Sequence, residues 1–190
     1  MLIDIVIFDG FDELDAIAPY EVLRTAEQLG APLRAELVGA HGAGTVTASH
    51  GTRIVVERGP AGDVDMVLVP GGGWFHGRGV RDEIERGVLP RTLVAARDGG
   101  AIVGSVCTGA MLLAAAGLVE GRPATTHRSA HADLRAAGAE VVEARFVDDG
   151  DLVTAGGVTS GLDLALHIVE KVAGASLAQQ VAREVEYERR

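Results

Sequence analysis

Short, largely apolar runs that stop abruptly at turn-forming residues constrain this fold more than any other feature of the sequence. Three such runs, at 2–8, 64–69 and 101–106, end at Asp-Gly, at Pro-Gly-Gly-Gly and at Cys-Thr-Gly, respectively. A continuous apolar run of this length is typical of a strand that is buried on both faces, as in a parallel sheet covered by helices. The pattern therefore predicts an α/β fold with a mostly parallel sheet.

Segments with helical spacing alternate with these strand-like runs. Apolar residues between 14 and 29 recur at helical intervals until Gly30 and Pro32 stop the pattern. The alternation predicts a single doubly wound domain over residues 1–190, with helices on both faces of the sheet and the functional site at the carboxyl ends of its strands. Further helices are expected at 80–98, 107–116, 130–137, 160–173 and 177–186, further strands at 34–40, 141–147 and 152–155, and hairpins at 42–56 and around 148–151.

The composition bounds the size of the domain and excludes several classes of partner. With 190 residues, of which 47% are apolar, the chain is long enough to bury a core and short enough for one domain. Acidic residues outnumber basic ones by 27 to 17, and Lys and Arg form no cluster, which excludes nucleic acid as a partner. No stretch reaches 18 uncharged apolar residues and the N-terminus lacks a signal peptide pattern, so we expect a soluble cytoplasmic protein without a membrane partner.

Cys107 is the only cysteine, so it can form neither an intramolecular disulfide nor a metal site rich in thiolates. The sequence around it, Gly-Ser-Val-Cys-Thr-Gly, places it where a buried strand turns abruptly into a helix, in the layout of a nucleophile elbow. Backbone N–H groups and the helix dipole at such a position lower the pKa of a thiol. A cysteine that merely packs beneath a helix would have apolar neighbours instead of Gly104, Thr108 and Gly109, so we predict a nucleophile.

Two other loops are expected at the same edge of the sheet. Asp15 lies in an apolar setting, where a carboxyl group is costly without a partner, so we expect it to stay protonated and to donate a hydrogen bond to the Cys107 thiolate. Backbone N–H groups of the glycine loop at 71–73 can stabilise negative charge on a substrate. This loop lacks the GxGxxG and GK[ST] spacings, which excludes dinucleotides and ATP, and we expect no cofactor.

The remaining polar candidates are open to two interpretations each. His127 is either a base for the thiol or a structural histidine, and the acids Asp12 and Glu13 cap the following helix or face solvent. The pair Trp74-Phe75 forms either a lid over the substrate or a packing contact between subunits, and we favour packing. No grouping of His, Asp and Glu has the spacing of metal ligands, so we expect no metal.

Five motifs along the chain are specific when they are taken together. They are Asp15 in the loop after the first strand, Val69-Pro70-Gly71-Gly72, Ser105-Val106-Cys107-Thr108-Gly109, Ala124-Thr125-Thr126-His127 and the segment from Thr154 to Asp163. With these motifs the chain resembles the ThiJ/PfpI superfamily, and the resemblance extends from Leu2 to Glu186. Most branches carry glutamate at the position of Asp15, and the aspartate resembles the branch of isonitrile (isocyanide) hydratases. Arg128 stands where those hydratases carry an aromatic residue.

The resemblance implies a flavodoxin-like fold of the class I glutamine amidotransferase type and a homodimer that acts on a small molecule. It implies a hydro-lyase that hydrates an isocyanide to an N-substituted formamide, with Cys107 as nucleophile, Asp15 as its carboxyl partner and Thr108 as a neighbouring hydrogen-bonding residue. Two alternatives stay open: a hydrolase of the glyoxalase, amidase or protease type, and a non-enzymatic redox sensor that works through the same cysteine. The substrate-binding residues expected are Gly72, Gly73, Gly157, Val158 and His127.

Overall fold

A six-stranded sheet runs through the centre of the structure, a computed structural model that describes residues 1–75 and 77–189. Within these residues the strand order is β2-β1-β5-β6-β10-β9, and every neighbouring pair is parallel except β10 with the edge strand β9. The prediction of a mostly parallel sheet is therefore confirmed. The strands are β1 (Leu2–Ile7), β2 (Arg34–Gly39), β5 (Met66–Val69), β6 (Ile102–Val106), β9 (Phe146–Asp148) and β10 (Leu152–Ala155).

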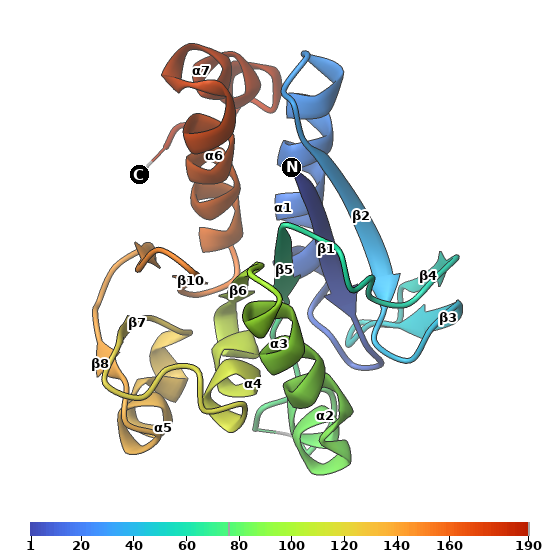
Figure 1. Cartoon of the computed structure of the whole chain (residues 1–190), viewed down its shortest axis with the longest axis vertical. Helices are drawn as coiled ribbons and strands as arrows, with labels where there is room; N and C mark the ends of the chain where they lie inside the picture. Colours follow the sequence, from blue (N-terminus) through green and yellow to red (C-terminus); the bar gives the residue numbers. More distant parts are fainter. Residues whose placement is uncertain (76, 190) are drawn as a thin grey trace.

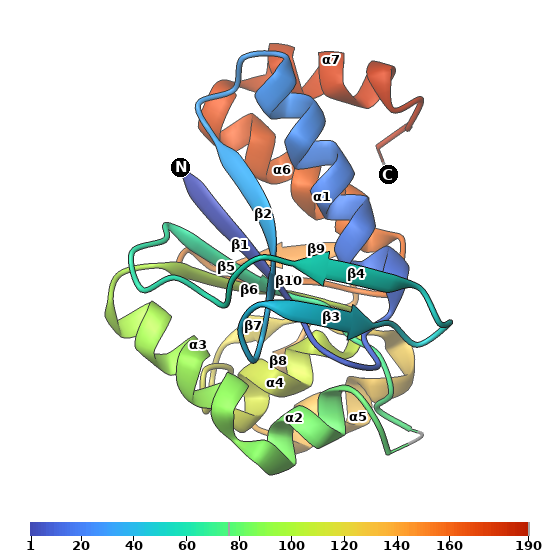
Figure 2. The ribbon, with the colours of Figure 1, turned by 90° about the vertical axis from the view of Figure 1, so that its right-hand side faces the viewer.

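Helices cover both faces of the sheet and give the molecule three layers (Figures 1 and 2). On one face α1, α6 and α7 pack together, and on the other face α2, α3 and α4 do so, with α5 beside α4. The fold is therefore α/β and doubly wound, as the alternation of strands and helices predicts. The helices are α1 (Glu13–Gln28), α2 (Val80–Arg86), α3 (Val88–Asp98), α4 (Ala110–Ala115), α5 (His131–Ala136), α6 (Ser160–Ala173) and α7 (Ala175–Glu184).

The central strands are buried because helices lie on both of their faces. All residues of β5 and β10 are buried, and so is β1 from its second residue onwards. Since β1, β5, β6 and β10 are parallel, their carboxyl ends lie at one edge of the sheet. The segments that follow these four strands therefore come together there, and they include the glycine loop and Cys107.

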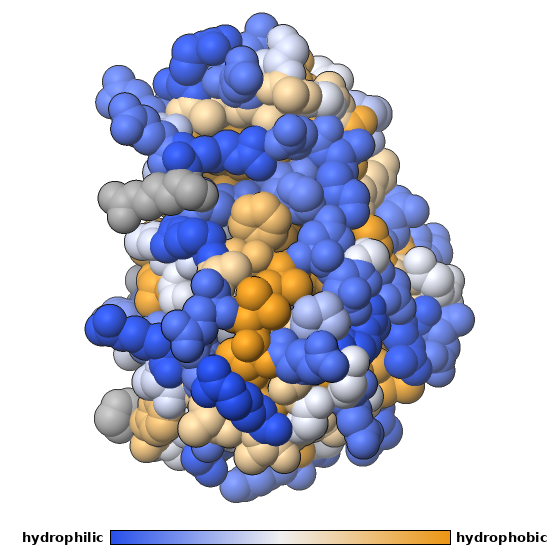
Figure 3. Space-filling view, turned by 90° about the vertical axis from the view of Figure 1, so that its left-hand side faces the viewer, coloured by the Kyte–Doolittle hydropathy of each residue, from blue (hydrophilic) through white to orange (hydrophobic). Residues whose placement is uncertain are grey.

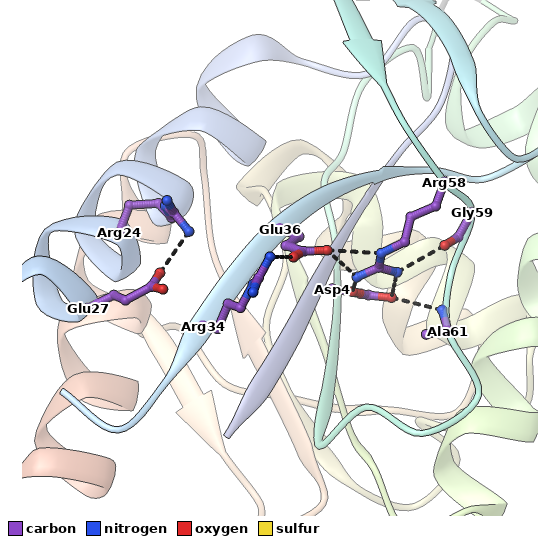
Figure 4. Close-up of polar contacts among 8 residues, drawn as sticks. All are labelled: Asp4, Arg24, Glu27, Arg34, Glu36, Arg58, Gly59 and Ala61. Carbon is purple, nitrogen blue, oxygen red and sulfur yellow. Dashed lines mark hydrogen bonds and ion pairs between the residues drawn. The ribbon is translucent and has the colours of Figure 1, made fainter.

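Asp4 is the one charged residue of β1, and its side chain is fully buried. Figure 4 shows the guanidinium of Arg58 against it: Arg58 donates to both carboxylate oxygens of Asp4, at 2.6 and 2.9 Å, and also to Glu36 on β2. The backbone N–H of Ala61 donates to Asp4 Oδ2 at 2.9 Å. A buried carboxylate requires such partners, so this cluster fixes the segment 58–61 to the sheet.

Two expected helices differ from the prediction because the backbone changes direction within them. The segment 80–98 is divided into α2 and α3 at Gly87, whose φ of 66° lies in the left-handed region that glycine adopts readily. The segment 107–116 begins with the 3₁₀ turn η1 (Cys107–Gly109), and α4 follows it. The other helices begin and end within about two residues of the predicted positions, as is usual for helix ends.

The strand expected at 141–147 is wrong, because its two ends pair with different partners. The first end is β8 (Glu140–Val141), which pairs with β7 (Pro123–Ala124), a short strand that the sequence analysis missed. The other end is β9, which forms the expected hairpin with β10. The hairpin expected within 42–56 is also present, as β3 (Gly44–Thr47) and β4 (Arg53–Val56).

The surface is mostly polar, with local apolar areas. Figure 3 shows one face of the molecule, on which apolar side chains gather near the middle and charged side chains surround them. Among the residues that the structure describes, no helix combines the length and the apolar character needed to cross a bilayer.

Candidate active site

The four loops at the carboxyl edge of the sheet are joined by hydrogen bonds. The backbone N–H of Asp12, after β1, donates to the carbonyl of Gly71, after β5, at 2.8 Å. The backbone N–H of Gly72 donates to Thr108 Oγ1 at 3.0 Å, and that of Cys107 donates to the carbonyl of Gly156, after β10, at 2.9 Å. The topology therefore brings Asp15, Cys107 and Thr108 into one constellation, as the sequence predicts.

Cys107 lies on a sharp turn between β6 and η1. Its φ is 58°, a left-handed conformation that is rare for residues other than glycine and that clusters at functional sites. Its carbonyl accepts a hydrogen bond from Thr126 Oγ1 at 2.7 Å, so both backbone groups of the cysteine are held in place. Only 7% of the residue is exposed. The surrounding loops thus maintain a strained backbone that presents the thiol at the edge of the sheet.

Asp15 is buried in the first turn of α1 and contacts the thiol. Its Oδ2 accepts a hydrogen bond from the Gly71 N–H at 3.1 Å, and the carboxyl group also interacts with Cys107. No nitrogen or oxygen of the described residues bonds to Oδ1. Burial, supported by the negative charge of Asp12, raises the pKa of Asp15 to about 8. The carboxyl group is therefore protonated at neutral pH, as its apolar sequence context indicates.

The expectation of a low thiol pKa is wrong for Cys107. Burial raises the pKa of the thiol, and the neighbouring acid Asp15 raises it further. The backbone N–H of Thr108 acts in the opposite direction, but its effect is smaller. Backbone N–H groups at a helix N-terminus lower the pKa of a thiol locally, and at Cys107 burial and the nearby acid outweigh them. The thiol therefore keeps its proton at neutral pH.

The glycine loop differs from its expected role, because two of its N–H groups are already used. Gly71 donates to Asp15 and Gly72 donates to Thr108, so neither N–H is available to a substrate. Gly73 N–H has no acceptor among the described residues. Gly71 and Gly72 thus serve to position the carboxyl group and the hydroxyl group beside the cysteine, and the hydroxyl group of Thr108 accepts from the loop.

Gly71→Ala is expected to lower the free energy of unfolding by about 1–3 kcal/mol, because overpacking a close contact costs about that much. A Cβ at Gly71 would lie 2.6 Å from both N and Oγ1 of Thr108 and 2.9 Å from Asp15 Oδ2. Urea denaturation measures the difference. Gly62→Ala is the matched control, since a Cβ there meets nothing within 4 Å. Equal stability of the two variants would contradict the close approach of these groups.

His127 accepts a hydrogen bond from Ser129 and is not placed by any hydrogen bond as a base for Cys107 among the described residues. Its Nδ1 accepts the backbone N–H of Ser129 at 3.3 Å and lies 2.6 Å from Ser129 Oγ. Burial and the nearby charge of Arg128 lower the pKa of His127, so the ring is neutral and carries its proton on Nε2. The ring packs against Gly157, where a Cβ would lie 2.9 Å from His127 Cδ2. No hydrogen bond joins the ring to Cys107 among the described residues.

A cavity of about 640 Å³ lies beside the elbow. Two of its lining residues are the hydrogen-bond partners of Cys107, namely Thr126 and Gly156. The structure places three of the five predicted substrate-binding residues in its wall: His127, Gly157 and Val158. Gly72 and Gly73 do not line this cavity, and Gly73 lines a separate one of about 750 Å³. The lining residues are Thr126, His127, Arg128, His131, Glu143, Ala144, Arg145, Gly156, Gly157, Val158, Thr159 and Ser160.

Sequence reasoning missed Arg145, which fixes the cavity wall after β10. Its carbonyl accepts the N–H of Gly156, and its guanidinium binds Thr159 and the buried carboxylate of Asp163. Tyr187, near the end of the chain, donates to the same carboxylate. An acid within the apolar pattern of α6 was the signal that could have indicated this cluster, since a buried acid needs a cation or a donor.

Trp74 packs within its own chain. Its Nε1 donates to Asp133 Oδ2 on α5 at 2.7 Å, and the guanidinium of Arg81 lies over the indole ring at 4.3 Å. Phe75 is 55% exposed.

Of the two acids before Asp15, Asp12 caps α1 by accepting the N–H of Leu14, as expected. Glu13 instead accepts hydrogen bonds from the turn between β3 and β4.

Comparisons with known proteins are consistent with this arrangement. The model of the DJ-1/PfpI family matches residues 1–171. Isonitrile hydratase from Pseudomonas putida is 35% identical over 190 residues, which cover 97% of this chain and 78% of the relative. Protein dj-1beta from Drosophila melanogaster is 26% identical over 94% of this chain and 93% of its own length. The crystal structure of a ThiJ/PfpI family protein from Pseudomonas syringae superposes with a TM-score of 0.87 at 26% identity, covering 100% of this chain and 76% of that one.

Proposed function

The chain belongs to the DJ-1/PfpI family, and we propose that it is an enzyme that hydrates an isocyanide to an N-substituted formamide. The observation that carries this proposal is the contact between a thiol on a strained turn and a buried, protonated carboxyl group. The identity of 35% to an isonitrile hydratase supports the choice of substrate. The proposed nucleophile is Cys107, and Asp15 is its acid and base.

An isocyanide suits this pair because its terminal carbon must gain a nucleophile and a proton. In the proposed first step, Cys107 Sγ bonds to that carbon while a proton from the Asp15–Cys107 pair is delivered to the same atom, which gives a thioimidate, R–N=CH–S. Water then adds to the carbon, the C–S bond breaks and the thiol recovers a proton. The sum is R–NC plus H₂O giving R–NH–CHO. No electron transfer and no cofactor are needed.

The same geometry gives less support to the two alternatives. A redox sensor requires an accessible thiolate, whereas the Cys107 thiol is buried and burial raises its pKa. A hydrolase that attacks a carbonyl requires a general base and free N–H groups for the oxyanion. His127 Nδ1 is occupied by Ser129, and the N–H of Gly72 is occupied by Thr108.

Formation of a formamide from phenyl isocyanide tests the proposal. We expect steady turnover by the wild-type protein, followed by absorbance, and no turnover by Cys107→Ala. A short incubation quenched with acid should reveal by mass spectrometry the covalent thioimidate on Cys107. Absence of turnover with both aryl and alkyl isocyanides, alongside turnover of a dicarbonyl or an amide, would sink the proposed substrate.

A further inference from the structure

Among the residues that the structure describes, one charged side chain in the cavity beside Cys107 has no balancing partner. Arg145 is paired with Asp163 at 2.6 Å, and Glu143 faces Arg135 at 3.7 Å. Arg128 lines the cavity, is exposed, and forms no ion pair or hydrogen bond with any residue that the structure describes. The positive charge of Arg128 acts on the neighbouring imidazole ring and contributes to the lowered pKa of His127. This guanidinium, unpaired within the described part of the chain, belongs to a protein whose formal net charge is −10.

The ring beside Arg128 adds a hydrogen-bond donor with a fixed direction. Ser129 occupies His127 Nδ1, so the proton lies on Nε2, which has no acceptor among the described residues. His131 also lines the cavity, but its Nε2 is 3.2 Å from the carbonyl of Thr126 and is used there. The cavity thus offers a free guanidinium and a free imidazole N–H. It offers one acid, Glu143, whose side chain is 77% exposed.

We infer that the cavity binds an anionic group of the substrate, a carboxylate, and that Arg128 selects for it. A planar guanidinium binds a carboxylate through two parallel hydrogen bonds, and an imidazole N–H can donate a further one. The inference rests on the proposed function: the isocyanide carbon reaches Cys107 and the acidic substituent on nitrogen lies in the cavity. The substrate class is therefore an isocyanide that carries a carboxylate.

A matched pair of substrates tests the inference, 4-isocyanobenzoate and its methyl ester. We expect wild-type kcat/KM to be about tenfold higher for the carboxylate, as for one charge-assisted contact. Arg128→Gln should abolish this preference, and high salt should weaken it. Arg135→Gln is the control, because Arg135 is a neighbouring exposed arginine outside the cavity lining, and it should retain the preference. Equal rates for acid and ester in the wild type would overturn the inference.

Binding of the products separates this inference from the proposed function. Calorimetry with 4-formamidobenzoate and its methyl ester requires no turnover. Tighter binding of the acid by about tenfold, lost in Arg128→Gln and kept in Arg135→Gln, supports the anion site even if neither isocyanide reacts. If the isocyanides are turned over but acid and ester bind equally, the proposed function stands and the selective role of Arg128 is wrong. If neither product binds, the anion site is wrong.

Discussion

Asp15→Asn is expected to abolish most of the proposed isocyanide hydration while making the fold more stable at neutral and alkaline pH. Asparagine has the shape of aspartate and its oxygen can still accept the N–H of Gly71, but it neither gives nor takes a proton. General acid–base catalysis contributes about 10²–10⁴-fold, so kcat for an isocyanide should fall by that factor. Steady-state kinetics measures the loss. If the variant keeps more than a tenth of the wild-type kcat, the proposed role of Asp15 as acid and base is wrong.

The gain in stability follows from the direction of the pKa shift. The pKa of Asp15 is about 8 in the folded protein, against an ordinary value of 3.8, so between these values the folded protein holds a proton that the unfolded chain has released. The stability due to this proton is complete below about pH 4 and is lost as pH rises through about 8. Asparagine has no proton to lose. At pH 8 we therefore expect the variant to exceed wild type by about 2–5 kcal/mol.

Urea denaturation at pH 4.5 and pH 8 tests this expectation. Wild type should lose stability between the two values, and Asp15→Asn should lose less. Asp98→Asn is the control, because Asp98 is an exposed acid whose only described ion pair is with Arg97, and its pH dependence should resemble that of wild type. Parallel pH profiles for wild type and Asp15→Asn would show that Asp15 is ionised in the folded protein at neutral pH.

The fold could be predicted because the buried parallel strands of the central sheet carry their own local signals. The run at 64–69 is apolar and ends at Pro-Gly-Gly-Gly, and neither property depends on distant residues. The errors in the predicted strands arise where pairing with distant residues determines the secondary structure. The segment 141–147 is apolar enough for one strand, but Val141 pairs with Ala124, and the guanidinium of Arg145 binds Asp163. The strand β7, with which β8 pairs, has only two residues, and so short a strand has no sequence signal of its own.

The sequence was enough to predict that the candidate site residues lie close together, but it was not enough to predict their electrostatics. Parallel topology is enough to bring Asp15, Cys107 and Thr108 to one edge of the sheet, because each of them follows the carboxyl end of a parallel strand. The pKa of the thiol depends on burial and on the neighbouring carboxyl group, which appear only in three dimensions. The same holds for the N–H of Gly72, which the hydroxyl of Thr108 occupies. Local motifs in the sequence identify the candidate site residues. The packing of the folded chain determines which of their hydrogen-bonding groups lack a partner.

Arg58→Met is expected to destabilise the protein by about 3–5 kcal/mol, although Arg58 lies far from the candidate site along the chain. The side chain of Asp4 is fully buried, and Arg58 donates to both of its oxygens. Methionine keeps the length of the side chain but leaves the carboxylate with the N–H of Ala61 as its remaining hydrogen-bond donor among the described residues. Breaking a buried ion pair by removing one partner costs about that much, because the other charge stays buried and uncompensated.

Two further variants separate the buried ion pair from general effects of losing an arginine. Arg34→Met removes an arginine that is 65% exposed and pairs with Glu36 at the surface, so it should change the free energy of unfolding by less than about 1 kcal/mol. The double variant Asp4→Leu/Arg58→Met removes both charges, and it should be more stable than Arg58→Met alone, since no charge is left buried. Urea denaturation of the set gives the coupling energy of the pair. If the double variant loses the sum of the two single losses, Asp4 and Arg58 contribute independently, and the segment 58–61 is held to the sheet by packing instead of by this ion pair.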